Sequence, residues 1–192
     1  HIQATKAIPY ITGIPSASLE QLKSFCASLA TYGGAALFHM PGITPEAGQH
    51  SPPVESLTIT QADVDEANCS LNVTGRDAVD FLSLGCPHLT LAEIARIAGL
   101  LEGKQVTREF WITAARPVLQ MAERQGYIQT ITAAGAKIAA DTCCVVAPIK
   151  GRFTALATDS AKACYYAAGK NNFKTLFLPF DQVVMLATGD GQ

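Results

Sequence analysis

The sequence has little charge and no block of basic residues. Charged residues make up 16% of its 192 residues, and the formal net charge is −2. A nucleic-acid surface needs clustered Lys and Arg side chains, so we expect no nucleic-acid partner. No apolar run reaches the roughly 20 residues that span a membrane. We therefore expect a cytoplasmic protein without a membrane partner.

Cysteine is sparse and lacks paired spacing. The six cysteines lie at positions 26, 69, 86, 143, 144 and 164. Small secreted disulfide scaffolds are far denser in cysteine, and zinc sites favour paired C-x-x-C spacings. Cys26, Cys69 and Cys164 have apolar neighbours on expected helices, which predicts packing roles. No G-x-x-x-x-G-K-[ST] or G-x-G-x-x-G loop occurs, so the sequence does not support nucleotide binding.

Apolar residues are abundant, at 48% of the chain, and predict a well-buried core. The chain begins at His1 rather than Met, and we expect it to be the C-terminal part of a larger domain. Proline-rich residues 41–56 indicate a loop or boundary. We expect residues 1–50 to form a strand–helix–strand segment, and residues 51–192 to form an α/β domain that carries the functional residues.

Strand and helix patterns alternate along the chain. The predicted strands cover residues 7–15, 35–40, 78–85, 109–114, 142–148, 153–159 and 174–180. The predicted helices cover residues 16–33, 60–72, 89–103, 116–126 and 160–170, with a weaker helix or turn in 127–141. This alternation predicts an α/β fold with a mostly parallel sheet, in which loops after the strands build the site.

Two cysteines are candidates for chemistry. Cys86 lies between Gly85 and Pro87, at a strand end that precedes a helix. A helix N-terminus lowers a cysteine pKa, so a metal or cluster ligand, a nucleophile and a buried core cysteine all remain possible. Cys143 and Cys144 should point to opposite faces of the expected strand, so one can serve a site. An iron–sulfur cluster can draw its cysteines from distant loops.

A strand-to-helix turn supplies polar groups. Thr158, Ser160 and Lys162 would place hydroxyls and an ammonium where a carboxylate or phosphate binds well. The alternative is an ordinary helix cap with a solvated lysine. His39 lies in an expected buried strand and is interpreted as a core residue.

Four stretches occur in the order and approximate spacing of a known family. They are ALFHMPGITPEA (36–47), LGCPHLTLAEI (84–94), DTCCVVAP (141–148) and TDSAKACYYA (158–167). In them the chain resembles the aconitase X family. The resemblance implies aconitase-like α/β/α layers, an iron–sulfur cluster and hydro-lyase activity. Family members include cis-3-hydroxy-L-proline dehydratase and an archaeal mevalonate 5-phosphate dehydratase.

The resemblance also implies site residues. Cys86 and Cys143 match two cluster cysteines, and the third belongs to a Cys-Thr-Pro-Tyr stretch that this chain lacks. The cluster could be of the 2Fe-2S, 4Fe-4S or 3Fe-4S type. A small swivelling domain or subunit supplies a catalytic serine in the family. We therefore expect this chain to be inactive by itself.

The expected reaction is the removal of water from a small hydroxy acid, with cis-3-hydroxy-L-proline converted to pyrroline-2-carboxylate as the first candidate. Thr158, Ser160 and Lys162 would hold the substrate carboxylate. His88 would act in catalysis by tuning the cluster or the leaving hydroxyl, or would instead cap a helix. Mevalonate 5-phosphate is the alternative substrate, and a non-catalytic α/β module that binds an anion or a partner is the alternative function.

Overall fold

The computed structural model describes residues 7–190. The chain forms two compact units, His1–Val64 and Asp65–Gln192. Helix α3 (Gln61–Leu71) corresponds to the helix predicted at 60–72, and its residues fall on both sides of this division. The domain division that the sequence suggests at residue 50 stays a prediction.

The first unit contains little regular structure. Its helix α2 (Leu19–Ser28) is capped by Ser18, which forms a capping box with Gln21. A π-helical turn, η1 (Leu29–Gly33), continues this helix. The 3-10 turn η2 (Ala47–Gln49) follows. The strands predicted at 7–15 and 35–40 are wrong, since only one bridge joins the two segments, at Tyr10 and His39. Proline cannot donate to a ladder and glycine bends the chain, so the Gly- and Pro-rich sequence here does not sustain pairing.

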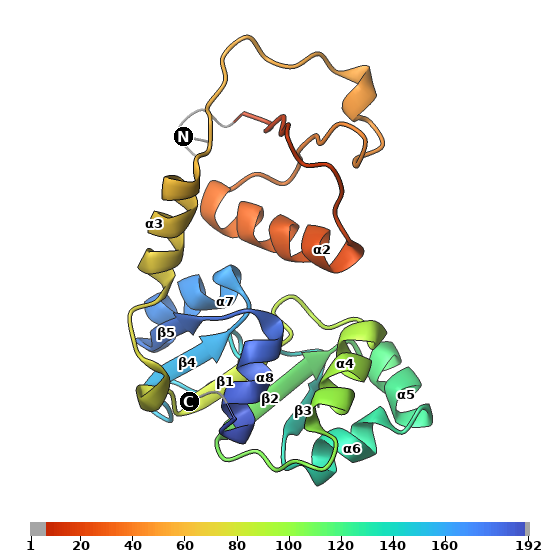
Figure 1. Ribbon diagram of the computed structural model, residues 1–192, viewed down its shortest axis with the longest axis vertical. Helices are drawn as coiled ribbons and strands as arrows, with labels where there is room; N and C mark the ends of the chain where they lie inside the picture. Colours follow the sequence, from red (N-terminus) through yellow and green to blue (C-terminus); the bar gives the residue numbers. More distant parts are fainter. Residues whose placement is uncertain (1–6, 191–192) are drawn as a thin grey trace. The chain divides into compact units, whose positions relative to one another are not determined.

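The second unit is built on a parallel sheet of five strands (Figure 1). The strands are β1 (Phe81–Leu84), β2 (Glu109–Ala114), β3 (Lys137–Ala140), β4 (Ala155–Thr158) and β5 (Lys174–Phe177). Their order is β3-β2-β1-β4-β5, and every pair runs parallel. The α/β fold with a parallel sheet is therefore confirmed.

Helices cover both faces of this sheet. The helices α4 (Leu91–Leu101), α5 (Arg116–Arg124), α6 (Tyr127–Ala133) and α8 (Phe180–Thr188) pack with each other and with the larger core cluster. The opposite face carries α7 (Ala161–Tyr166), its π-helical continuation η4 (Ala167–Asn171) and the loop after β3. A short 3-10 turn, η3 (Arg76–Ala78), precedes β1. None of the helices within residues 7–190 is long and apolar enough to cross a membrane.

One strand was predicted in the wrong place. Residues 142–148 form turns, and the strand is β3, which lies just before them. The apolar run of cysteines and valines resembled a strand, whereas the alanine-rich segment that forms β3 has low β-propensity. Asp141 ends β3 in the left-handed region, with a φ of 57°. Strand β3 nevertheless forms because its backbone pairs with β2 along its whole length.

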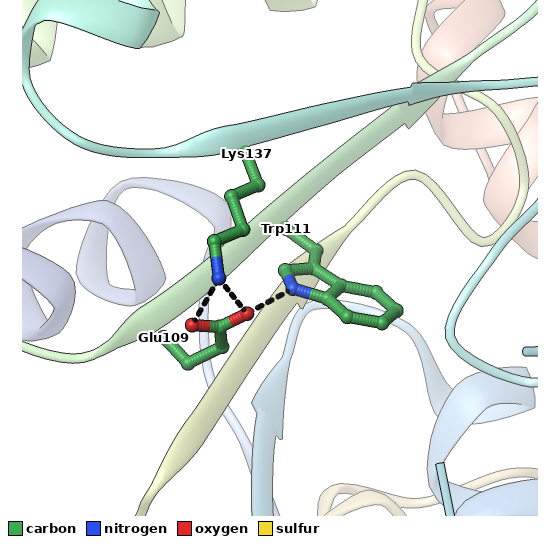
Figure 2. A network of polar contacts seen from close by, with 3 residues as sticks. All are labelled: Glu109, Trp111 and Lys137. Atoms are coloured by element: carbon green, nitrogen blue, oxygen red, sulfur yellow. Dashed lines mark hydrogen bonds and ion pairs between the residues drawn. The ribbon is translucent and has the colours of Figure 1, made fainter. Parts of the chain in front are cut away.

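A polar network joins two strands where they begin (Figure 2). The carboxylate of Glu109, the first residue of β2, accepts hydrogen bonds from Trp111 Nε1 at 2.6 Å and from Lys137 Nζ at 2.7 and 2.8 Å. Burial opposes ionisation of Glu109, but the bonds from Lys137 and Trp111 outweigh it and keep its pKa below the ordinary value. The network stabilises the pairing of β2 and β3 at the sheet end opposite to the cysteine-bearing loops.

Candidate functional site

The candidate site lies where the sheet reverses its winding. The chain leaves β1 through α4 towards β2, and leaves β4 through α7 towards β5, on the opposite side. Because β1 and β4 are neighbours, their carboxyl ends form a topological switch point, the place where open α/β sheets bind ligands. Cys86 follows β1 here, and Ser160 follows β4.

Gly85 allows the end of β1 to approach β2 closely. Its φ is +112°, and a Cβ atom at this position would lie 2.1 Å from the Thr113 carbonyl oxygen. The Thr113 hydroxyl donates to the Gly85 carbonyl at 2.9 Å. A residue without a Cβ atom is therefore required here, and the approaching group is the backbone of β2.

The fold brings Cys86 and Cys143 together. The Cys86 thiol is buried and donates a hydrogen bond to the sulfur of half-buried Cys143. This bond lowers the pKa of Cys143 to about 5; burial opposes the shift, while the N–H groups of Val145 and Val146 and the charge of Lys162 add to it. The same bond and burial raise the pKa of Cys86 far above its ordinary value. The bond therefore favours the thiol at Cys86 and the thiolate at Cys143.

Cys143 belongs to a turn and not to a strand. Its carbonyl accepts hydrogen bonds from Val146 N and Ala147 N, both at 3.1 Å. Cys144 is buried, its thiol is hydrogen-bonded with Ser83, and burial raises its pKa to about 11. The two adjacent cysteines therefore do diverge, but through a turn and not through the alternation of a strand.

His88 bridges the two cysteine-bearing segments. Its Nε2 lies 2.9 Å from the carbonyl oxygen of Thr142. A carbonyl only accepts, so this nitrogen carries the proton. His88 is not the helix cap, because Thr90 caps α4 and forms a capping box with Glu93. Its catalytic role stays a prediction, and its observed contact holds the Cys143 segment near Cys86.

The hydroxyls of Thr158 and Ser160 are buried and engaged. The Ser160 hydroxyl donates to the Cys86 carbonyl and accepts from Ala163 N at 3.1 Å, which caps α7. The Thr158 hydroxyl accepts from Ser160 N at 3.3 Å. Their role in substrate binding stays a prediction, since the observed bonds hold the switch-point loop together.

Lys162 lies in the first turn of α7 and is half-buried. Its positive charge contributes to the lowered pKa of Cys143 and offsets a small part of the rise in the pKa of Cys86. Of the three predicted substrate-binding residues, Lys162 is the one that carries a charge, and this charge acts on the thiol pair. An anion that binds beside this pair would meet that charge.

The other cysteines divide by burial. Cys164 is buried and hydrogen-bonded with Thr175, which confirms its packing role. Cys26 and Cys69 are exposed, so their predicted packing roles are wrong. An apolar stripe on a short helix does not show whether a neighbouring element covers that stripe. The two exposed cysteines provide matched controls for experiments on Cys86 and Cys143.

Sequence reasoning missed the contacts that anchor the Cys143 turn. Asp141 accepts hydrogen bonds from Arg116 N at 2.9 Å and Arg116 Nε at 3.1 Å. Further on, Lys170 Nζ donates to the carbonyl of Val145 at 2.9 Å. An aspartate that ends an alanine-rich segment is a usable sequence signal, because Asp tolerates the left-handed region. The lysine contact has no local signal.

The paired thiols suit an iron–sulfur cluster as two of its ligands. Thiolate sulfur is the donor that such clusters and soft metal ions prefer. Within residues 7–190, no group of three or more His, Cys, Asp or Glu side chains is arranged to hold a metal ion. The described residues thus offer two thiol donors at this point, Cys86 and Cys143.

A separate groove of about 740 Å³ lies beside α5, α6 and β3. It is lined by Arg116, Leu119, Gln120, Glu123, Ile128, Thr132, Ala136, Lys137, Ile138 and Ala140. None of the candidate residues lines it. We therefore place the candidate site at the paired thiols and the switch point, and not in this groove.

The sequence matches two domain models of one family over most of its length. Residues 79–189 match the aconitase X third domain, and residues 2–68 match the aconitase X second domain. The chain belongs to the aconitase X family, which confirms the resemblance seen in the sequence.

Relatives with known activities are similar over most of this chain. The phosphomevalonate dehydratase large subunit of Methanothermobacter thermautotrophicus is 38% identical over 169 residues, which cover 86% of this chain and 42% of that subunit. The cis-3-hydroxy-L-proline dehydratase of Pseudomonas aeruginosa is 33% identical over 177 residues, which cover 84% and 30%. This chain spans less than half the length of both relatives.

A solved structure supports the fold. The crystal structure of Thermococcus kodakaraensis aconitase X in its holo-form matches with a TM-score of 0.87 and 31% sequence identity. The match covers 94% of this chain and 47% of the other. The aconitase-like α/β architecture implied by the sequence resemblance is thereby confirmed.

Proposed function

We propose that this chain is the part of an aconitase X dehydratase that holds two cluster ligands and binds the substrate carboxylate. The contact between the Cys86 and Cys143 thiols at the switch point carries the proposal. The similarity to two dehydratases supports the reaction class. A non-catalytic scaffold would not require two thiols and an ammonium at one point.

Cys86 and Cys143 would hold an iron–sulfur cluster together with a cysteine from outside this chain. When bound, an open iron site supplies Lewis acidity for the departing hydroxyl. His88 and Ser160 keep the two cysteine-bearing segments in place through their bonds to the Thr142 and Cys86 carbonyls. The site is thus arranged by the chain's own hydrogen bonds.

Lys162 would bind the carboxylate next to which the proton leaves. A charge-assisted hydrogen bond to a carboxylate is stronger than a neutral one and orients the acid. Removal of the neighbouring proton requires a base. His88 Nε2 does not serve as this base while it donates to Thr142. The catalytic serine that the family carries on its small swivelling domain or subunit is the candidate that we propose for this role.

The substrate class follows from what the relatives' substrates share. Cis-3-hydroxy-L-proline and mevalonate 5-phosphate both carry a hydroxyl on the carbon β to a carboxylate. Lys162 fits the shared carboxylate and does not distinguish between the two acids. The relatives support both, so we propose a small 3-hydroxy acid, with cis-3-hydroxy-L-proline and mevalonate 5-phosphate as the two substrates to test.

The test uses the complete enzyme, reconstituted without oxygen. We expect visible iron–sulfur absorbance, and dehydration of one of the two acids. Cys86→Ser and Cys143→Ser should each lose the absorbance, whereas Cys26→Ser, at an exposed position, should keep it. Full absorbance in Cys86→Ser would disprove the ligand assignment. Binding of either acid without any turnover would favour the non-catalytic alternative.

A further inference from the structure

Lys170 contacts the turn that presents Cys143. It lies in the π-helical segment η4, and its Nζ donates to the Val145 carbonyl at 2.9 Å. π-Helical turns are rare and occur often at functional sites. We propose that Lys170 is a positioning residue for Cys143, acting through the peptide group between Val145 and Val146. This inference rests on the proposed role of Cys143 as a cluster ligand.

The peptide group transmits the contact. A trans peptide is planar, so its C=O and N–H point in opposite directions. When Lys170 holds the Val145 carbonyl, the N–H of Val146 is turned the other way. That N–H donates to the Cys143 carbonyl at 3.1 Å. One ammonium thus orients the peptide group that closes the turn at Cys143.

Helix α7, which η4 continues, also contacts the Cys86 segment. At its start, the Ser160 hydroxyl donates to the Cys86 carbonyl and accepts from Ala163 N. Residues 160–171, which we call the brace, therefore bind the Cys86 segment at one end and the Cys143 turn at the other. Because the brace is continuous, it sets the distance between the two thiols before any third ligand arrives.

The effect of removing Lys170 should be local. The Cys143 turn has two other anchors, His88 on Thr142 and Arg116 on Asp141, and both lie before Cys143 in the chain. Loss of the lysine contact leaves these anchors intact. The change should therefore be confined to the part of the turn after Cys143, at Val146 and Ala147.

Amide hydrogen exchange of the cluster-free enzyme tests this directly. In Lys170→Ala we expect the amides of Val146 and Ala147 to exchange at least tenfold faster. The amides of Thr154 and Ala155, which donate to Asp80, should keep their rates. Lys170→Arg should restore slow exchange, since a guanidinium can also donate to the carbonyl.

Exposed Lys174 provides the matched control, and Lys174→Ala should change neither region. Unchanged exchange at Val146 and Ala147 in Lys170→Ala would overturn the inference. Equal acceleration at Thr154 and Ala155 would also overturn it, because it would show general destabilisation of the fold.

Cluster lifetime gives a second readout. In the reconstituted enzyme, Lys170→Ala should lose its visible absorbance at least threefold faster after a chelator is added, and Lys170→Arg should match the wild type. An unchanged lifetime would overturn the role in ligand positioning. If the wild-type enzyme forms no cluster but the exchange results hold, the role of Lys170 in the turn stands and the proposed function fails.

Discussion

At the scale of single residues, the site depends on charge placed beside sulfur. The hydrogen bond between the two sulfurs favours a thiolate at Cys143, and the charge of half-buried Lys162 acts on both cysteines. An ammonium in such a place can interact with the proposed iron–sulfur cluster, with a substrate carboxylate or with both. Its kinetic importance therefore separates substrate binding from a solvated helix lysine.

Lys162→Ala should lower kcat/KM of the complete enzyme at least tenfold, because the substrate carboxylate loses a charge-assisted hydrogen bond worth about 1.5–3 kcal/mol and about 1.4 kcal/mol is a factor of ten. The cluster spectrum should stay intact, since no ligand is removed. Steady-state kinetics and the absorbance of the same sample provide the measurement. Lys174→Ala is the control, and kinetics as unaffected as in that control would remove Lys162 from the site.

At the scale of elements, the two ends of the sheet depend on particular residues. The end of β1 lies so close to β2 that only glycine fits at position 85. A different device joins β2 and β3 where they begin, through the carboxylate of Glu109. The two devices stabilise opposite ends of the same sheet and can be tested independently.

Gly85→Ala should destabilise the second unit by at least about 2 kcal/mol, because a Cβ atom would clash with the Thr113 carbonyl and a φ of +112° strains alanine. Gly99→Ala is the matched control. Gly99 lies within α4 with no atom within 4 Å of an added Cβ, so this change should stabilise by about 0.5–1 kcal/mol. Urea unfolding of both variants measures the two effects, and equal midpoints would contradict the close approach.

Glu109→Gln should reduce the loss of stability in acid. The folded pKa of Glu109 lies below its ordinary value of 4.5, so its ionised form contributes stability that is fully present above pH 4.5. That contribution is lost as the pH falls from 4.5 through the lowered folded pKa. The difference in urea midpoint between wild type and variant should therefore be largest at pH 7 and shrink below pH 4.5. A constant difference across this range would count against the network.

At the scale of the whole molecule, the chain spans less than half of both relatives, and its described residues include no group of three side chains arranged to hold a metal ion. The purified 192-residue chain should therefore show no dehydration of either candidate acid, whereas the complete enzyme should. Product formation over time, with equal protein concentrations, is the measurement. Turnover by the 192-residue chain near the rate of the complete enzyme would show that this part is sufficient.

Local sequence signals determined most of the second unit. Capping at Thr90, proline at the start of α5 and the apolar runs of β1, β2, β4 and β5 all act within a few residues, so their elements were predicted correctly. The Gly-Cys-Pro-His motif at a strand end likewise marked Cys86 as a candidate for chemistry, and the family resemblance made it a candidate ligand. These features depend on neighbours in the chain, which the sequence displays directly.

Only the tertiary structure decided the rest. Strand β3 forms because β2 offers a paired edge, and the turn at Cys143 forms because Arg116, His88 and Lys170 hold it from three other segments. The same contacts place Cys143 against Cys86, while the Ser160 hydroxyl bonds separately to the Cys86 carbonyl. Each of these depends on residues far apart in the chain, whose approach is set by the packing of the whole sheet.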